Sequence, residues 1–119
     1  MQIIFDEKLV PELKKRYVVL ELDTVMQPEM TAPITLYALI DNIDLNTMTN
    51  LETLVSQHDE LVRDYKKGNW DSAAFNANAM KGTWRGELDE FYDLVISTAS
   101  EYGKTGDIWS GVRFTTPKE

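Results

Sequence analysis

The chain contains a single histidine, His58, which is the first candidate for a general base. A catalytic histidine normally works with a second polar group, and here Asp59 and Glu60 follow directly in sequence. Adjacent residues on a helix do not face each other, so neither is placed to orient the ring. Val55 and Leu61 lie at helical spacing from His58 and define an apolar stripe with it. We therefore predict that His58 is structural.

Carboxylates gather in residues 87–93, where Glu87, Asp89, Glu90 and Asp93 crowd one predicted helix. Hard cations such as Mg²⁺ bind oxygen ligands of this kind. The sequence has no EF-hand loop and no Glu-x-x-His or His-Glu-x-x-His pattern, and it has no cysteine for a thiolate site. We interpret these carboxylates as a solvated helix face and predict no metal and no cofactor. A small enzyme that uses carboxylates, with or without a divalent metal, is the alternative.

Charge is distributed unevenly along the chain, whose formal net charge is −8. Residues 17–48 contain five acidic side chains and no lysine or arginine. The densest basic cluster, residues 14–16, lies close to Glu12. A chain with this balance repels DNA and RNA, so we expect no nucleic-acid partner. Uncompensated negative charge favours a cationic protein partner instead.

Two alternating segments, residues 17–26 and 32–40, flank a turn at residues 27–31 and predict a β-hairpin. The more apolar face should pack on helices. We call the opposite face the outer face, and its predicted residues are Val19, Glu21, Asp23, Thr35, Tyr37 and Leu39. This face combines carboxylates, an aromatic ring and aliphatic groups, and interfaces favour aromatic residues. We predict that it docks a cationic protein partner; a second copy of the chain in a homodimer is the alternative occupant.

Two longer helices follow the predicted hairpin. Thr49 and Glu52 match a capping box at the start of an apolar stripe that runs to about Gly68. Asp71 is the predicted cap of a second stripe, which reaches about residue 99. Gly82 and Gly86 predict a bend or a break within it.

Shorter elements complete the predicted fold: a strand at residues 2–5, a helix ending near residue 16 and a last strand at residues 108–115. The order is β-α-β-β-α-α-β. This predicts an α+β fold, in which an antiparallel sheet containing a β-hairpin packs against two longer helices. We expect one domain over residues 1–119, with residues 115–119 frayed. The absence of cysteine, of a signal peptide and of a long apolar run predicts a soluble, cytoplasmic protein without a membrane partner.

Three segments resemble small uncharacterised proteins of tailed marine phages: residues 20–24 (LELDT), residues 68–70 (GNW) and residues 86–92 (GELDEFY). The resemblance implies a bacterial-cell setting and a small accessory role. It implies no activity and no site residues.

Function is less determined by the sequence than fold. Without a catalytic constellation, we predict a small acidic accessory or interaction protein that binds a protein partner. The carboxylate enzyme and a structural virion component are the alternatives. A deep pocket with converging carboxylates would favour the enzyme, and a flat surface with exposed aromatic residues would favour the interaction protein.

Overall fold

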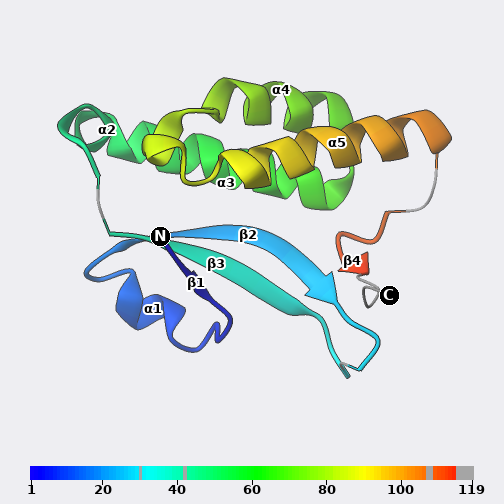
Figure 1. Cartoon of the computed structure of the whole chain (residues 1–119), viewed down its shortest axis with the longest axis horizontal. Coiled ribbons are helices and arrows are strands. Elements are labelled where there is room, and N and C mark those ends of the chain that lie inside the picture. The colour runs from blue at the N-terminus through cyan, green and yellow to red at the C-terminus, as the bar shows by residue number, and fades with distance from the viewer. Residues whose placement is uncertain (30, 42, 107–108, 115–119) are drawn as a thin grey trace.

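The structure, a computed structural model, describes residues 1–29, 31–41, 43–106 and 109–114. Its elements in chain order are β1 (Gln2–Ile4), α1 (Val10–Leu13), β2 (Val18–Met26), β3 (Ile34–Ile40), α2 (Leu45–Thr49), α3 (Leu51–Lys67), α4 (Trp70–Met80), the 3₁₀ helix η1 (Thr83–Gly86), α5 (Asp89–Thr105) and β4 (Arg113–Phe114). The longer helices form a layer on one face of the sheet, and α1 lies on the other face (Figure 1). The fold is α+β, as predicted.

The sheet has the strand order β1-β3-β2-β4. The predicted hairpin is confirmed, because β2 and β3 are antiparallel neighbours, and β1 is antiparallel to β3. The predicted last strand rejoins the sheet only at residues 113–114, where β4 lies parallel to β2 beside Val25 and Met26. Residue 108 and the predicted frayed tail, residues 115–119, lie outside the described residues.

A β-bulge in β2 changes which residues lie on each face. Glu21 pairs with Tyr37 and Thr24 pairs with Thr35, so Leu22 and Asp23 together stand opposite one residue of β3. The extra residue interrupts the alternation, as bulges do. Asp23 therefore faces the helical layer and is 2% exposed. Its predicted place on the outer face is wrong, because strict alternation does not allow for an inserted residue.

Helix α1 covers part of the outer face. Val10 of α1 packs with Val19 and Leu39, while Leu13 and Tyr37 lie at the border of this small cluster. Val19 is 6% and Leu39 is 5% exposed. The prediction that these two residues belong to an open surface is therefore wrong. The apolar groups of the short helix remove them from water.

Both predicted helix caps are corrected. Thr49 is the last residue of α2, and its hydroxyl donates to a carbonyl within that helix at 2.9 Å. Asp44 is the actual cap of α2, since its carboxylate accepts a hydrogen bond from the Thr47 amide at 2.7 Å. Asp71 lies in the first turn of α4, and Asn69 is the N-cap residue. The apolar stripe did not indicate that a separate short helix, α2, precedes α3.

The predicted break in the second stripe is confirmed. Between α4 and α5 the backbone is left-handed at Gly82, Trp84, Arg85 and Gly86, with φ values of 88°, 59°, 58° and 76°. For a residue with a side chain this conformation costs roughly 1–2 kcal/mol. Trp84 offsets that cost, because it is 1% exposed and its indole N–H donates to the Tyr92 hydroxyl at 2.9 Å.

The main core lies between the sheet and the helical layer. Its buried members come from β2, β3, α3, α4, η1 and α5 and include Leu20, Ile40, Leu61, Tyr65, Trp84 and Val95. None of the helices in the described part of the chain has the length and apolar character that a bilayer crossing requires.

Candidate functional site

A pocket of about 480 Å³ lies beside β2, where side chains of α1, on one face of the sheet, and of α3, on the other, come together. We call it the edge pocket. Its lining residues are Val10, Lys14, Glu21, Tyr37, Asp59, Val62, Arg63, Lys66 and Lys67. Strand β4 pairs with β2 only at the far end of that strand, beside Val25 and Met26. At the pocket, the edge of β2 is therefore not covered by β4, and residues of α1 and α3 flank it.

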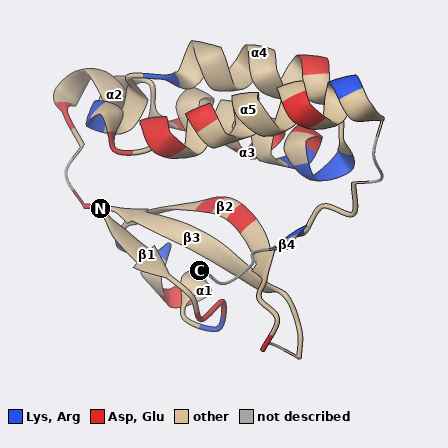
Figure 2. Cartoon of the chain, turned by 45° about the vertical axis from the view of Figure 1, so that its right-hand side comes forward, with Lys and Arg blue, Asp and Glu red and all other residues tan. Residues whose placement is uncertain are grey.

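The edge pocket is basic, in contrast to the chain as a whole. Four of its lining side chains are cations and two are carboxylates, which gives a local charge of +2 in a chain of −8. Basic residues occupy the C-terminal end of α3 (Figure 2). Within the residues that the structure describes, Lys14, Arg63 and Lys67 form no ion pair. Three cations are therefore available to a ligand.

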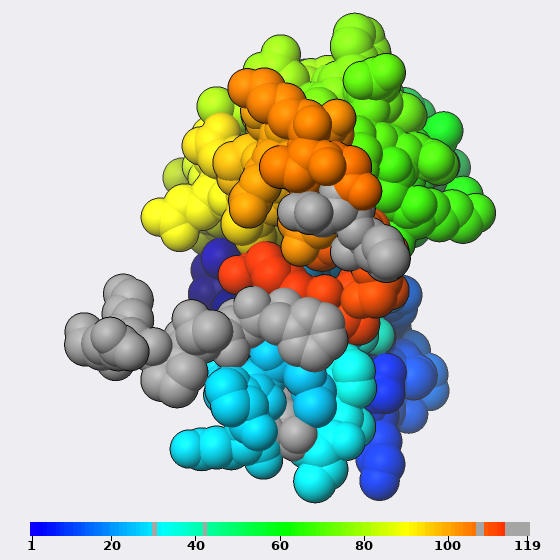
Figure 3. Space-filling model, turned by 90° about the vertical axis from the view of Figure 1, so that its right-hand side faces the viewer, coloured from blue at the N-terminus to red at the C-terminus, as the bar shows by residue number. Residues whose placement is uncertain are grey.

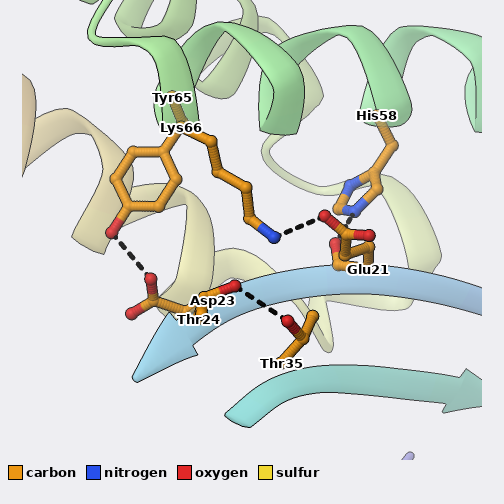
Figure 4. A network of polar contacts seen from close by, with 7 residues as sticks. All are labelled: Glu21, Asp23, Thr24, Thr35, His58, Tyr65 and Lys66. Carbon is orange, nitrogen blue, oxygen red and sulfur yellow. Dashed lines mark hydrogen bonds and ion pairs between the residues drawn. The ribbon is translucent and has the colours of Figure 1, made fainter. Parts of the chain in front are cut away.

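The fourth cation is held by the protein itself. The Lys66 ammonium donates to a carboxylate oxygen of Glu21 at 2.5 Å (Figure 4). Tyr37 is the β3 partner of Glu21 and lines the same pocket. Burial, and then the nearby carboxylates of Glu21 and Glu7, raise the pKa of Tyr37 above its ordinary value. A tyrosine hydroxyl is protonated at neutral pH in any case, so it can donate a hydrogen bond.

His58 fixes α3 to β2 directly behind Glu21. Its Nε2 lies 2.6 Å from the Glu21 carbonyl oxygen, and its Nδ1 lies 3.0 Å from the Tyr92 hydroxyl. A carbonyl only accepts, so Nε2 carries the proton, and the neutral Nδ1 accepts from Tyr92. The Tyr92 oxygen in turn accepts from Trp84. Burial lowers the pKa of His58 below its ordinary value. Both ring nitrogens are thus engaged in the interior.

A second buried contact fixes the C-terminal end of α3. The Asp23 carboxylate accepts hydrogen bonds from the Tyr65 hydroxyl at 3.0 Å and from Nε of Arg113 at 2.6 Å. Trp109 donates its indole N–H to the Tyr65 carbonyl at 2.7 Å. Residues 109–114 lie between the helical layer and the hairpin at this end of the molecule (Figure 3). These contacts hold the last turn of α3, which carries Lys66 and Lys67.

The six predicted partner-binding residues do not form one surface. Glu21 and Tyr37 line the edge pocket. The Thr35 hydroxyl lies 2.9 Å from the Thr24 hydroxyl, in a half-buried pair between the strands. Val19 and Leu39 lie under α1, and Asp23 faces the helices, as described above. The outer face therefore contributes only two residues to the candidate site.

Sequence reasoning missed the four basic residues of the edge pocket. Arg63, Lys66 and Lys67 stand at i, i+3 and i+4 on α3, which places them on one side of the helix. That spacing was a usable signal. Lys14 belongs to the cluster noted at residues 14–16, but only the fold brings it to α3. From the sequence, in which residues 14–16 are the densest basic cluster, no compact basic patch was expected; the edge pocket shows that this expectation is wrong.

The carboxylates considered for a metal have other contacts. Asp89 accepts from the Gly82 amide at 2.8 Å, and Asp93 pairs with Lys81 at 2.7 Å. Glu87 accepts from the amino group of Met1 at 2.9 Å. In the described part of the chain, no group of three or more histidine, aspartate or glutamate side chains is arranged to hold a metal ion.

Comparisons with protein-family models, with curated proteins and with solved structures found no match to this chain.

Proposed function

We propose that this is a small interaction protein that binds a protein partner through the edge pocket, and that the partner contributes an acidic segment. One observation carries the proposal: Lys14, which directly follows α1, lines the same pocket as Arg63, Lys66 and Lys67 of α3. Because the rest of the chain is acidic, electrostatic attraction for an anionic group is strongest at this pocket. The partner's charge is thus opposite to the one predicted from the sequence.

The composition of the pocket suits a peptide segment. Val10 and Val62 supply apolar wall, and the cations lie around it. The aliphatic stem of an acidic side chain can pack against the apolar wall, and its carboxylate can pair with the cations. A long polyanion would meet the surrounding negative charge as well as the pocket. The setting we propose, a bacterial cell in which the protein has an accessory role, rests only on the resemblance of residues 20–24, 68–70 and 86–92 to phage proteins.

The test is affinity capture from a cell lysate with charge-matched variants. Lys14→Glu/Arg63→Glu reverses two cations of the pocket, whereas Lys15→Glu/Lys104→Glu reverses two exposed cations outside it. Both double variants change the net charge by the same amount. Each bait is used near 0.05 M and near 0.3 M salt, because screening weakens exposed charge pairs.

We expect the wild type and the Lys15/Lys104 variant to capture the same protein, and the Lys14/Arg63 variant to lose it. Capture should also weaken at the higher salt, and circular dichroism should show that all three baits are folded. Equal capture by both double variants would refute the proposal, since the pocket's charge would then be irrelevant to the interaction.

A further inference from the structure

We propose that the group recognised in the edge pocket is a phosphate monoester carried by the protein partner. This inference rests on the function proposed above, and it specifies the chemistry of the anion.

The charge of the pocket matches a dianion. Four cations and two carboxylates line it, which leaves +2 to be neutralised. A phosphate monoester carries a charge of about −1.5 to −2 at pH 7, whereas a carboxylate carries about −1. A single glutamate or aspartate would leave part of the positive charge uncompensated. A doubly charged group of one ligand residue therefore fits the pocket best.

The available donors come from several side chains, whereas one carboxylate offers only two oxygens to them. Lys14, Arg63 and Lys67 are unpaired within the described residues, and they approach from two different helices. Tyr37 also lines the pocket and adds a hydroxyl donor. A phosphate offers three terminal oxygens, so it can accept from several directions at once, and guanidinium groups bind it with paired hydrogen bonds.

Glu21 limits how much negative charge a ligand can carry into the pocket. Its carboxylate holds Lys66 at 2.5 Å and therefore withdraws one of the four cations from the ligand. Asp59 adds a second negative charge to the lining. Groups with more charge than a monoester would meet repulsion from both carboxylates. The paired Lys66 and the three unpaired cations together favour one phosphate over a polyphosphate.

The test is an NMR titration of the ¹⁵N-labelled full chain in about 0.15 M salt, near physiological ionic strength. One peptide carries a single phosphoserine among neutral residues, a second has glutamate at that position, and inorganic phosphate is the third ligand. We expect the phosphopeptide to bind about tenfold more tightly than the glutamate peptide and to shift the amides of Lys14, Arg63 and Lys67. The Lys14→Glu/Arg63→Glu variant should lose about tenfold in affinity, and Lys15→Glu/Lys104→Glu less than about twofold.

The pH dependence gives an independent readout. The second phosphate pKa is near 6, so the dianion fraction falls about fourfold between pH 7.0 and pH 5.5. Phosphopeptide affinity should fall by about the same factor. Any protonation of the protein itself, for example at His58 behind Glu21, should affect both peptides. The affinity ratio of the two peptides is therefore the quantity to follow.

Three results would overturn the phosphate assignment. Equal affinity for the two peptides would do so, and it would leave the acidic-partner proposal standing. Inorganic phosphate binding as tightly as the phosphopeptide would overturn the partner as the source and indicate a free phosphate compound. Absence of pocket shifts at millimolar phosphopeptide would also overturn the assignment, while the capture experiment decides the proposed function separately.

Discussion

Acid should destabilise the fold through His58, because burial lowers the pKa of this residue in the folded state. In the unfolded chain the imidazole has its ordinary pKa of about 6.5. Unfolding below that pH therefore takes up a proton, and the free energy of unfolding falls as the pH falls. The stability that the neutral ring contributes is fully present above about pH 6.5 and is lost as the pH falls below it.

The size of this effect has a calculable upper limit. If the ring stays neutral in the folded state down to pH 5.5, one unit below the unfolded pKa, the loss between pH 7.5 and pH 5.5 is about 1.4 kcal/mol. The geometry opposes protonation of the ring in the folded state. A protonated Nδ1 could not accept from the Tyr92 hydroxyl, which lies 3.0 Å away, and the ring is fully buried.

Urea unfolding, followed by tryptophan fluorescence at pH 7.5 and at pH 5.5, measures the loss. The control is His58→Gln, which cannot titrate but leaves every carboxylate in place. The wild type should lose more stability than the variant over this interval, by up to about 1.4 kcal/mol. Because His58 is the only histidine in the chain, its ring protons also give a single NMR titration curve. An inflection at or above pH 6.5, or equal acid sensitivity of the two proteins, would refute the reasoning.

Three further predictions concern caps, buried charge and backbone. Asp44→Ala should lower stability by about 0.5–2 kcal/mol in thermal unfolding, whereas Thr49→Ala should change it by less than about 0.5 kcal/mol, because only Asp44 caps a helix. Asp23→Ala should cost about 1–3 kcal/mol in urea unfolding, because the buried Tyr65 hydroxyl loses its acceptor; an exposed Asp71→Ala control should change little. Gly111→Ala should destabilise the protein more than Gly106→Ala in the same assay, although both glycines have positive φ. A Cβ at Gly111 would lie 2.9 Å from the Lys66 carbonyl oxygen, whereas a Cβ at Gly106 would meet nothing within 4 Å.

The hairpin and the helical layer were predictable because their signals are periodic. Alternation in β2 and β3 and the apolar stripe of α3 each repeat over several residues, and tertiary packing agrees with them. The break at Gly82 and Gly86 was predictable because glycine has low helix propensity, and in the structure both glycines adopt left-handed backbone, which glycine tolerates. The burial of His58 followed from its helical phase.

The errors have local causes that one sequence does not reveal. One inserted residue in β2 turned Asp23 toward α3, and a bulge leaves no clear mark in an alternating segment. Thr49 matched a capping pattern but belongs to a preceding short helix. The basic pocket depends on Lys14 and Arg63 lining one pocket, although they lie far apart in the chain. Which residues form the candidate site therefore depends more on long-range packing than on any local sequence motif.

The central claim is that a protein partner lies over the edge pocket, and lysine acetylation footprinting of the captured complex tests it most directly. Reaction of each lysine with acetic anhydride is measured by mass spectrometry in the free protein and in the complex. We predict that Lys14 and Lys67 react at least about threefold more slowly in the complex, because bound partner atoms exclude the reagent, and that Lys15 and Lys104 react unchanged. Protection of Lys15 and Lys104 without protection of Lys14 and Lys67, or no protection of any lysine in a stable complex, would contradict the claim.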